Sequence, residues 1–160
     1  MPIRIPQYAD IHTPSAPTSR TETYGRNTGT PFSIYPDHDA TTVKTLEIWE
    51  GRASGDSAGL WVIKGLRITW FNDQRKQLYN HPQDGDQLKI LTFATNETMT
   101  ECSIRAAWRV DRIEIVTSRG QHLVAGGEGG TPYRNVARGS LVGYTGSAGW
   151  EVDNISVLYR

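Results

Sequence analysis

Four stretches of the chain alternate apolar and polar residues with a period of two. They are residues 43–49, 66–70, 110–116 and 155–159. Alternation of this kind places successive side chains on opposite faces of a strand, as in an antiparallel sheet with one buried face. No segment shows the periodicity of an amphipathic helix, and turn residues separate the stretches at positions 72–73, 84–86 and 118–120. The pattern predicts an all-β fold, either a barrel, a sandwich or a prism.

A weak internal repeat accompanies the strands. Residues 25–32 resemble residues 126–133, since both begin with a glycine-containing loop and end in Thr-Pro followed by an aromatic residue. The hairpin sequences around residues 66–79 and 111–124 are also similar. Either a fold built from similar β-units or a chance similarity between hairpins would produce such a repeat.

Size and charge fit a single domain with no electrostatic partner. The 160 residues carry 17 basic and 17 acidic side chains, and the aromatic residues do not alternate with a basic stripe. We therefore expect neither nucleic-acid binding nor attraction to an anionic membrane. Residues 1–22 contain four prolines and are expected to form an irregular N-terminal arm. The lone Cys102 is expected to be a buried, inert thiol.

The sequence contains no targeting or membrane signal. No stretch approaches the ~20 apolar residues of a membrane helix, so we expect no membrane insertion. The N-terminus lacks the apolar core and cleavage site of a signal peptide. We therefore expect a protein that is cytoplasmic or unconventionally secreted.

Patterns that would indicate catalysis or metal binding are missing from the sequence. The four histidines do not have metal-site spacing, and Asp37-His38-Asp39 is better interpreted as a polar turn than as a cation site. There is no nucleophile elbow and no P-loop, and the glycine-rich residues 126–130 lack the lysine and helix that phosphate binding needs. We expect no cofactor, no metal and no enzymatic activity. An enzyme has no positive support in the sequence.

The C-terminal run, residues 140–157, has an apolar strand with a glycine, then a Gly-x-x-x-Asp loop from Gly149 to Asp153, then a hydrophobic closing strand. This run resembles the last motif of the jacalin-related lectins. Residues 24–32 are similar to that family's first glycine loop, residues 111–120 to one of its hairpins, and residues 105–109 to its variable recognition loop. The resemblance covers residues 23–160, which we take as a lectin domain, and leaves out the arm.

The resemblance implies a β-prism, with three four-stranded antiparallel sheets in pseudo-threefold symmetry, and a shallow carbohydrate site at one end. Asp153 would accept hydrogen bonds from two adjacent sugar hydroxyls, and Gly149 would permit a tight loop. Backbone N–H groups of the intervening residues would donate to the sugar. The expected carbohydrate-binding residues are Gly25, Arg26, Ala107, Trp108, Gly149, Trp150, Glu151, Val152 and Asp153.

The first loop departs from the family pattern, because Arg26 and Thr28 stand between Gly25 and Gly29. Arg26 could narrow the site, add a donor or impair binding. Because more than twenty residues precede Gly25, the chain resembles the uncleaved members of the family that prefer mannose or glucose. This implies a non-catalytic lectin, with a protein-interaction β-prism that has altered or lost its sugar site as the alternative.

The spacing also bears on the number of sites. Asp153 is the single aspartate with a glycine four residues earlier, so we expect one complete site per chain. One weak site needs multivalency to be useful. We therefore expect a homo-oligomer, a dimer or higher.

Overall fold

The computed structural model describes residues 17–37 and 41–160. The first sixteen residues of the expected arm, and His38 and Asp39 of the polar turn, lie outside this range. Within it the chain forms β-strands and a single short 3-10 helix, η1 (Gly55–Ser57). The described residues contain no helix that could span a membrane.

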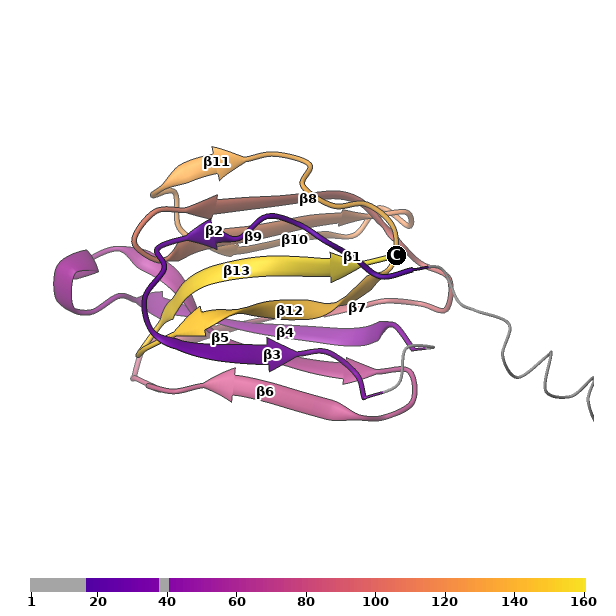
Figure 1. The fold of residues 1–160 in the computed structure, drawn as a ribbon, viewed down its shortest axis with the longest axis horizontal. Coiled ribbons are helices and arrows are strands. Elements are labelled where there is room, and N and C mark those ends of the chain that lie inside the picture. Colours follow the sequence, from indigo (N-terminus) through magenta and orange to yellow (C-terminus); the bar gives the residue numbers. More distant parts are fainter. Residues whose placement is uncertain (1–16, 38–40) are drawn as a thin grey trace, which may run out of the picture.

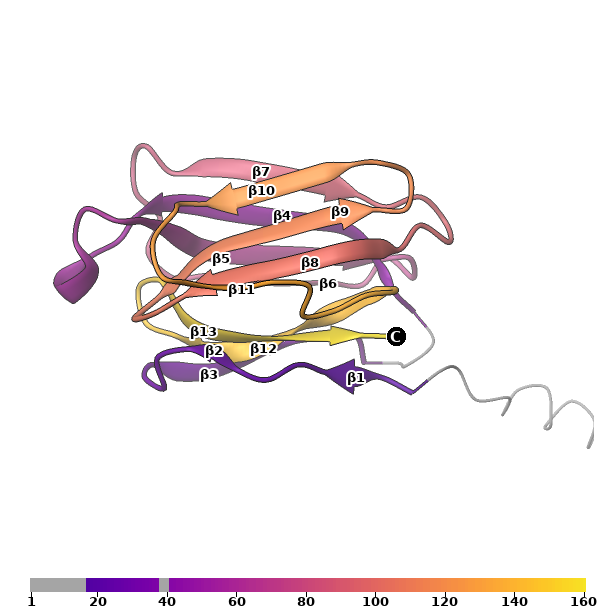
Figure 2. The same ribbon diagram turned by 90° about the horizontal axis from the view of Figure 1, so that it is seen from above.

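The strands form three antiparallel sheets, which lie side by side around one core (Figures 1 and 2). Sheet B has the order β6-β5-β4-β7 and sheet C the order β10-β9-β8-β11. Sheet B consists of β4 (Val43–Arg52), β5 (Trp61–Trp70), β6 (Arg75–Tyr79) and β7 (Gln87–Thr92). Sheet C consists of β8 (Met99–Ala106), β9 (Val110–Thr117), β10 (His122–Gly126) and β11 (Thr131–Tyr133).

Sheet A has the order β1-β13-β12-β3, and β2 pairs with the same edge of β13 as β1 does (Figure 1). One edge strand of this sheet is therefore divided into two short pieces. The expected β-prism of three four-stranded sheets is confirmed with this qualification. Sheet A consists of β1 (Ser19–Arg20), β2 (Tyr24–Gly25), β3 (Thr30–Ile34), β12 (Leu141–Ala148) and β13 (Val152–Tyr159).

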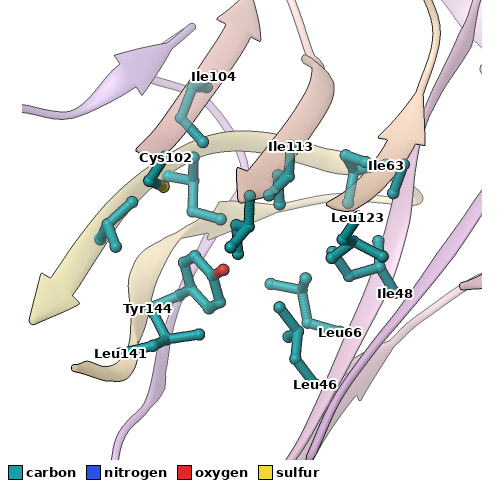
Figure 3. Packing of buried hydrophobic residues seen from close by; sticks show 14 of the residues in the cluster. Leu46, Ile48, Ile63, Leu66, Cys102, Ile104, Ile113, Leu123, Leu141 and Tyr144 are labelled. Atoms are coloured by element: carbon teal, nitrogen blue, oxygen red, sulfur yellow. The ribbon is translucent and has the colours of Figure 1, made fainter. Parts of the chain in front are cut away.

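Side chains from all three sheets meet in one hydrophobic core (Figure 3). Burial of these apolar side chains is the main force that holds the sheets together. The indole Nε1 of Trp70 in sheet B donates to the Val142 carbonyl of sheet A at 2.8 Å. Cys102 is fully buried, as expected, and burial raises the pKa of its thiol to about 12. The core residues labelled in Figure 3 are Leu46, Ile48, Ile63, Leu66, Cys102, Ile104, Ile113, Leu123, Leu141 and Tyr144.

Several turns gather at one end of the prism, opposite the C-terminus (Figures 1 and 2). They connect β2 to β3, β4 to β5, β8 to β9 and β12 to β13. The last of these contains the Gly-x-x-x-Asp motif. This end of the prism therefore positions the candidate site.

Candidate functional site

Asp153 is the second residue of β13, and the loop of residues 25–29 covers it. Gly25 pairs with the next residue, Asn154, and has a φ of 116°. A Cβ atom at Gly25 would collide with the Asp153 carbonyl oxygen. The backbone N–H of Arg26 donates to that same oxygen at 3.0 Å. Glycine is thus required at position 25 for both its backbone conformation and its close approach to β13.

The same loop reaches the Asp153 carboxylate with two further residues. The Thr28 hydroxyl donates to Asp153 Oδ2 at 3.2 Å. Gly29 has a φ of 90°, and a Cβ atom there would lie 2.5 Å from the same oxygen. Neither residue is among the nine expected from the sequence. Gly29 lies in the first glycine loop predicted from the sequence, residues 24–32, but its contact with Asp153 depends on the pairing of strands that are distant in the sequence.

Arg109 lies on the other side of the carboxylate. Its Nε atom is 3.4 Å from Asp153 Oδ1 and 2.9 Å from Glu151 Oε1. Its neighbours Ala107 and Trp108 are exposed in the turn between β8 and β9. The Arg26 guanidinium lies 4.7 Å above the Trp108 ring and 3.6 Å from Asp56. The fold thus brings residues 107–109 beside the loop of residues 25–29.

The turn between β12 and β13 differs from the expectation at Gly149. Gly149 does not have a positive φ, and a Cβ atom there would lie an ordinary 3.9 Å from Asp153 Oδ2. The backbone of the turn therefore does not require a glycine at this position. The absence of a side chain at Gly149 does, however, leave space beside the Asp153 carboxylate. Trp150 is 57% exposed, and one face of its indole stacks on His81 with 3.9 Å between ring centroids.

The side chains of Glu151 and Val152 point into the protein and stabilise the fold. The Val152 side chain is part of the hydrophobic core. The Glu151 carboxylate is buried and accepts hydrogen bonds from the Ser54 hydroxyl at 2.7 Å and from Arg109. Neither side chain is therefore available to a ligand, and the whole residues are only 1% and 0% exposed. The sequence motif gives no indication of the partnership with Ser54, which lies almost a hundred residues away.

The two carboxylates of the site have opposite pKa shifts. Burial raises the pKa of Asp153, and nearby Glu151 adds to this, while Arg109 and Thr28 partly oppose it. Burial acts in the same direction on Glu151, but hydrogen bonds from Arg109 and Ser54 outweigh it and leave its pKa below the ordinary value. Glu151 thus stays ionised and keeps its hydrogen bonds with Arg109 and Ser54. No group of three His, Cys, Asp or Glu side chains that could hold a metal occurs among the described residues.

The family model of the jacalin-like lectin domain matches residues 21–158 of the chain. The chain therefore belongs to the jacalin-like lectin family. Because this is a family of carbohydrate-binding domains, the match agrees with the expectation of a non-catalytic protein. No curated protein matches the sequence.

Solved structures of similar fold include plant lectins and parts of larger proteins. A Calsepa lectin in complex with a bisected glycan has a TM-score of 0.67 and 18% identity, covering 91% of this chain and 99% of the lectin. A Malaysian banana lectin has a TM-score of 0.65 and 20% identity, covering 90% and 99%. The lamprey immune protein has a TM-score of 0.72 and 21% identity, but the match covers 91% of this chain and only 45% of that protein. These likenesses establish the fold.

Proposed function

We propose that the protein binds mannose- or glucose-type glycans through Asp153 and the two turns beside it. The observation that carries the proposal is the position of this carboxylate, which lies between the backbone of Gly29 and the open Cα of Gly149. An ionised carboxylate has two acceptor oxygens and can take hydrogen bonds from two adjacent sugar hydroxyls. Such charge-assisted bonds are stronger than bonds between neutral groups.

The surroundings of the carboxylate fit a polar, uncharged ligand. Arg109 balances much of the negative charge of Glu151 and Asp153, so the site does not depend on a cationic partner. Trp108, which is 51% exposed, offers an apolar surface beside it. Two solved structures of similar fold support the sugar class: Calsepa lectin in complex with a biantennary N-glycan, and a mannose-binding lectin from Champedak.

A site of this kind binds a single sugar weakly. A site that offers only a few hydrogen bonds gives a dissociation constant on the order of millimolar, about −4 kcal/mol. Useful affinity for a cell-surface or multi-branched glycan then requires several linked sites. The proposal therefore includes a homo-oligomer, a dimer or higher, which light scattering coupled to size exclusion would detect as a mass at least twice that of the 160-residue chain.

Titration with methyl α-mannoside and with a mannose-terminated oligosaccharide tests the proposal. We expect saturable binding by the wild type and a loss of at least about tenfold in the Asp153→Asn variant, because two charge-assisted hydrogen bonds are weakened. Asp73→Asn is the matched control, since Asp73 is exposed in the turn between β5 and β6. Binding by Asp153→Asn equal to that of the wild type would show that the site lies elsewhere.

A protein-interaction module is the second candidate, and the Arg26 side chain favours it. Arg26 occupies the loop where the family has small residues, and its guanidinium contacts Trp108 and Asp56. In that case a broad glycan array gives no signal for the wild type, and the Arg26→Gly variant gains mannoside binding. Mannoside binding by the wild type that Arg26→Gly does not improve excludes this candidate.

A further inference from the structure

Two turns at the same end of the prism have nearly the same sequence. Residues 106–111 read Ala-Ala-Trp-Arg-Val-Asp, and residues 148–153 read Ala-Gly-Trp-Glu-Val-Asp. Four of these six residues are identical. The strand pairing is also the same, because Ala106 lies opposite Val110 in sheet C as Ala148 lies opposite Val152 in sheet A. Asp111 therefore occupies in sheet C the position that Asp153 has in sheet A.

A glycine loop covers Asp111 in the same way as residues 25–29 cover Asp153. Gly126 has a φ of 100°, and a Cβ atom there would collide with the Asp111 carbonyl oxygen. The backbone N–H of Gly127 donates to this oxygen at 2.8 Å. Gly25 and Arg26 make the same two contacts with Asp153.

The C-terminal end of this loop also approaches Asp111 in the way that the C-terminal end of residues 25–29 approaches Asp153. Gly130 has a φ of 74°, and a Cβ atom there would collide with Asp111 Oδ2, as one at Gly29 would meet Asp153 Oδ2. Arg112 Nε donates to the Gly127 carbonyl at 2.8 Å, and Asn154 Nδ2 makes the corresponding bond in sheet A at 2.7 Å. The repeat in the sequence thus reflects two equivalent units and is not a chance similarity of hairpins.

The Asp111 carboxylate differs from its counterpart because its Oδ2 atom has no hydrogen-bond donor within the part of the chain that the structure describes. Asp111 is 2% exposed, and among the described residues its Oδ2 atom has no hydrogen-bond partner. Gly129 stands where the first site has Thr28, whose hydroxyl donates to Asp153. A buried acceptor without a donor is costly, and a ligand hydroxyl would satisfy it. Burial also raises the pKa of Asp111.

Sheet B also has a charged residue at the position that Asp111 and Asp153 occupy in the other two sheets, and there the protein pairs the charge internally. In sheet B, Glu50 lies opposite Ile63 and Trp49 lies opposite Gly65, so the corresponding residue is Lys64. The Lys64 side chain is fully buried, and its Nζ atom donates to Gln83 Oε1 at 3.0 Å and to Asp86 Oδ1 at 3.3 Å. Both partners belong to the loop between β6 and β7. The described residues thus supply internal partners for Lys64 but none for Asp111 Oδ2.

We infer that Asp111, with residues 107–110 and 126–130, forms a second site for a hexose that offers two adjacent hydroxyls. The inference rests on the chemistry proposed for Asp153, and it replaces the expectation of one site per chain. Ala107 stands in place of the motif's glycine, but a Cβ atom at the corresponding Gly149 lies at an ordinary contact distance from the carboxylate. A hydroxyl reaches Oδ2 only when the covering loop shifts, which breaks the hydrogen bonds that Arg105 donates to the carbonyls of Gly129 and Gly130. The four glycines among residues 126–130 permit such a shift.

Amide chemical shifts during a titration with methyl α-mannoside separate the two sites. In the wild type we expect saturable shifts in both loops, residues 25–29 and 126–130. In Asp153→Asn the shifts of residues 126–130 should persist while those of residues 25–29 are lost. Asp111→Asn should show the reverse pattern, and the double variant should show neither.

The outcomes distinguish this inference from the proposed function. Shifts confined to residues 25–29 in the wild type, or no shift of residues 126–130 in Asp153→Asn, would overturn the second site and leave the first intact. No saturable shift in either loop of the wild type would overturn both. Should Asp111→Asn fail to fold, the Asp153→Asn titration decides the question alone, because it leaves the second site unchanged.

Discussion

Arg109 Nε lies 2.9 Å from Glu151 Oε1, and this contact joins the β8–β9 turn to the β12–β13 turn. Arg109 and Glu151 occupy corresponding positions in two turns of similar sequence. Ser54 of the β4–β5 loop donates to the same carboxylate with its hydroxyl and its backbone N–H. The buried carboxylate of Glu151 thus connects turns from all three sheets. Arg109 extends this hydrogen-bond network to Asp153.

Replacing Glu151 by Gln tests this network through stability. The substitution keeps the shape but removes the charge that Arg109 and Ser54 contact. We expect the free energy of unfolding at pH 7 to fall by about 1.5–3 kcal/mol, the usual contribution of a hydrogen bond to a charged group. Chemical denaturation measures it, and a cycle with Arg109→Gln gives the coupling. Purely additive effects of the two substitutions would contradict a direct interaction.

The same variant should respond to pH in a defined direction. The pKa of Glu151 is lowered in the folded protein, so its contribution to stability is present above its unfolded pKa of about 4.3 and is lost as the pH falls through the lowered value. The stability difference between the wild type and Glu151→Gln should therefore shrink from pH 7 to pH 3. A difference that stays constant over this range would show that the charge of Glu151 is not responsible.

Sugar binding should be lost on acidification at a higher pH than for an ordinary aspartate. Burial raises the pKa of Asp153, and the protonated carboxyl no longer accepts two hydrogen bonds. We expect the affinity for methyl α-mannoside to fall as the pH drops, with a midpoint above about 3.9. Titrations at several pH values measure it. Affinity unchanged between pH 7 and about pH 3.5, in a protein that remains folded, would exclude Asp153 as the acceptor.

Two glycines with nearly the same φ distinguish the cost of backbone strain from the effect of filling the site. Gly29 has a φ of 90° and Gly59 a φ of 91°, but a Cβ atom at Gly59 would meet no atom within 4 Å. Gly59→Ala should therefore cost about 1–2 kcal/mol of backbone strain and leave sugar binding unchanged. Gly29→Ala should cost more and abolish binding, because its methyl group displaces the Asp153 carboxylate. Unfolding and mannoside titration of both variants check this, and equal behaviour would contradict the assigned geometry.

The sequence predicts the strands well where the alternation is long. Residues 43–49 and 110–116 correspond to β4 and β9, because a period of two that continues over seven residues is typical of a strand with one buried face. β1 and β2 cannot be recognised in this way, since two residues are too few to show a period. They are strands because they pair with β13, which lies at the other end of the chain.

The site was only partly predictable for a similar reason. Asp153 can be found from a short local motif, whereas Arg109 and Gly29 reach it through tertiary contacts between distant turns. Asp111 has no glycine four residues earlier, so the same motif does not reveal it. The feature that the two aspartates share is the close approach of the opposite loop, which Gly126 and Gly130 make possible at Asp111.

A crystal structure of the protein with a bound mannoside tests the central claim most directly. We predict a hexose between the loop of residues 25–29 and the turn of residues 149–152, with two adjacent hydroxyls within hydrogen-bond distance of Asp153 Oδ1 and Oδ2. A mannoside bound elsewhere on the prism, with the Asp153 carboxylate free of sugar contacts, would contradict the proposed function.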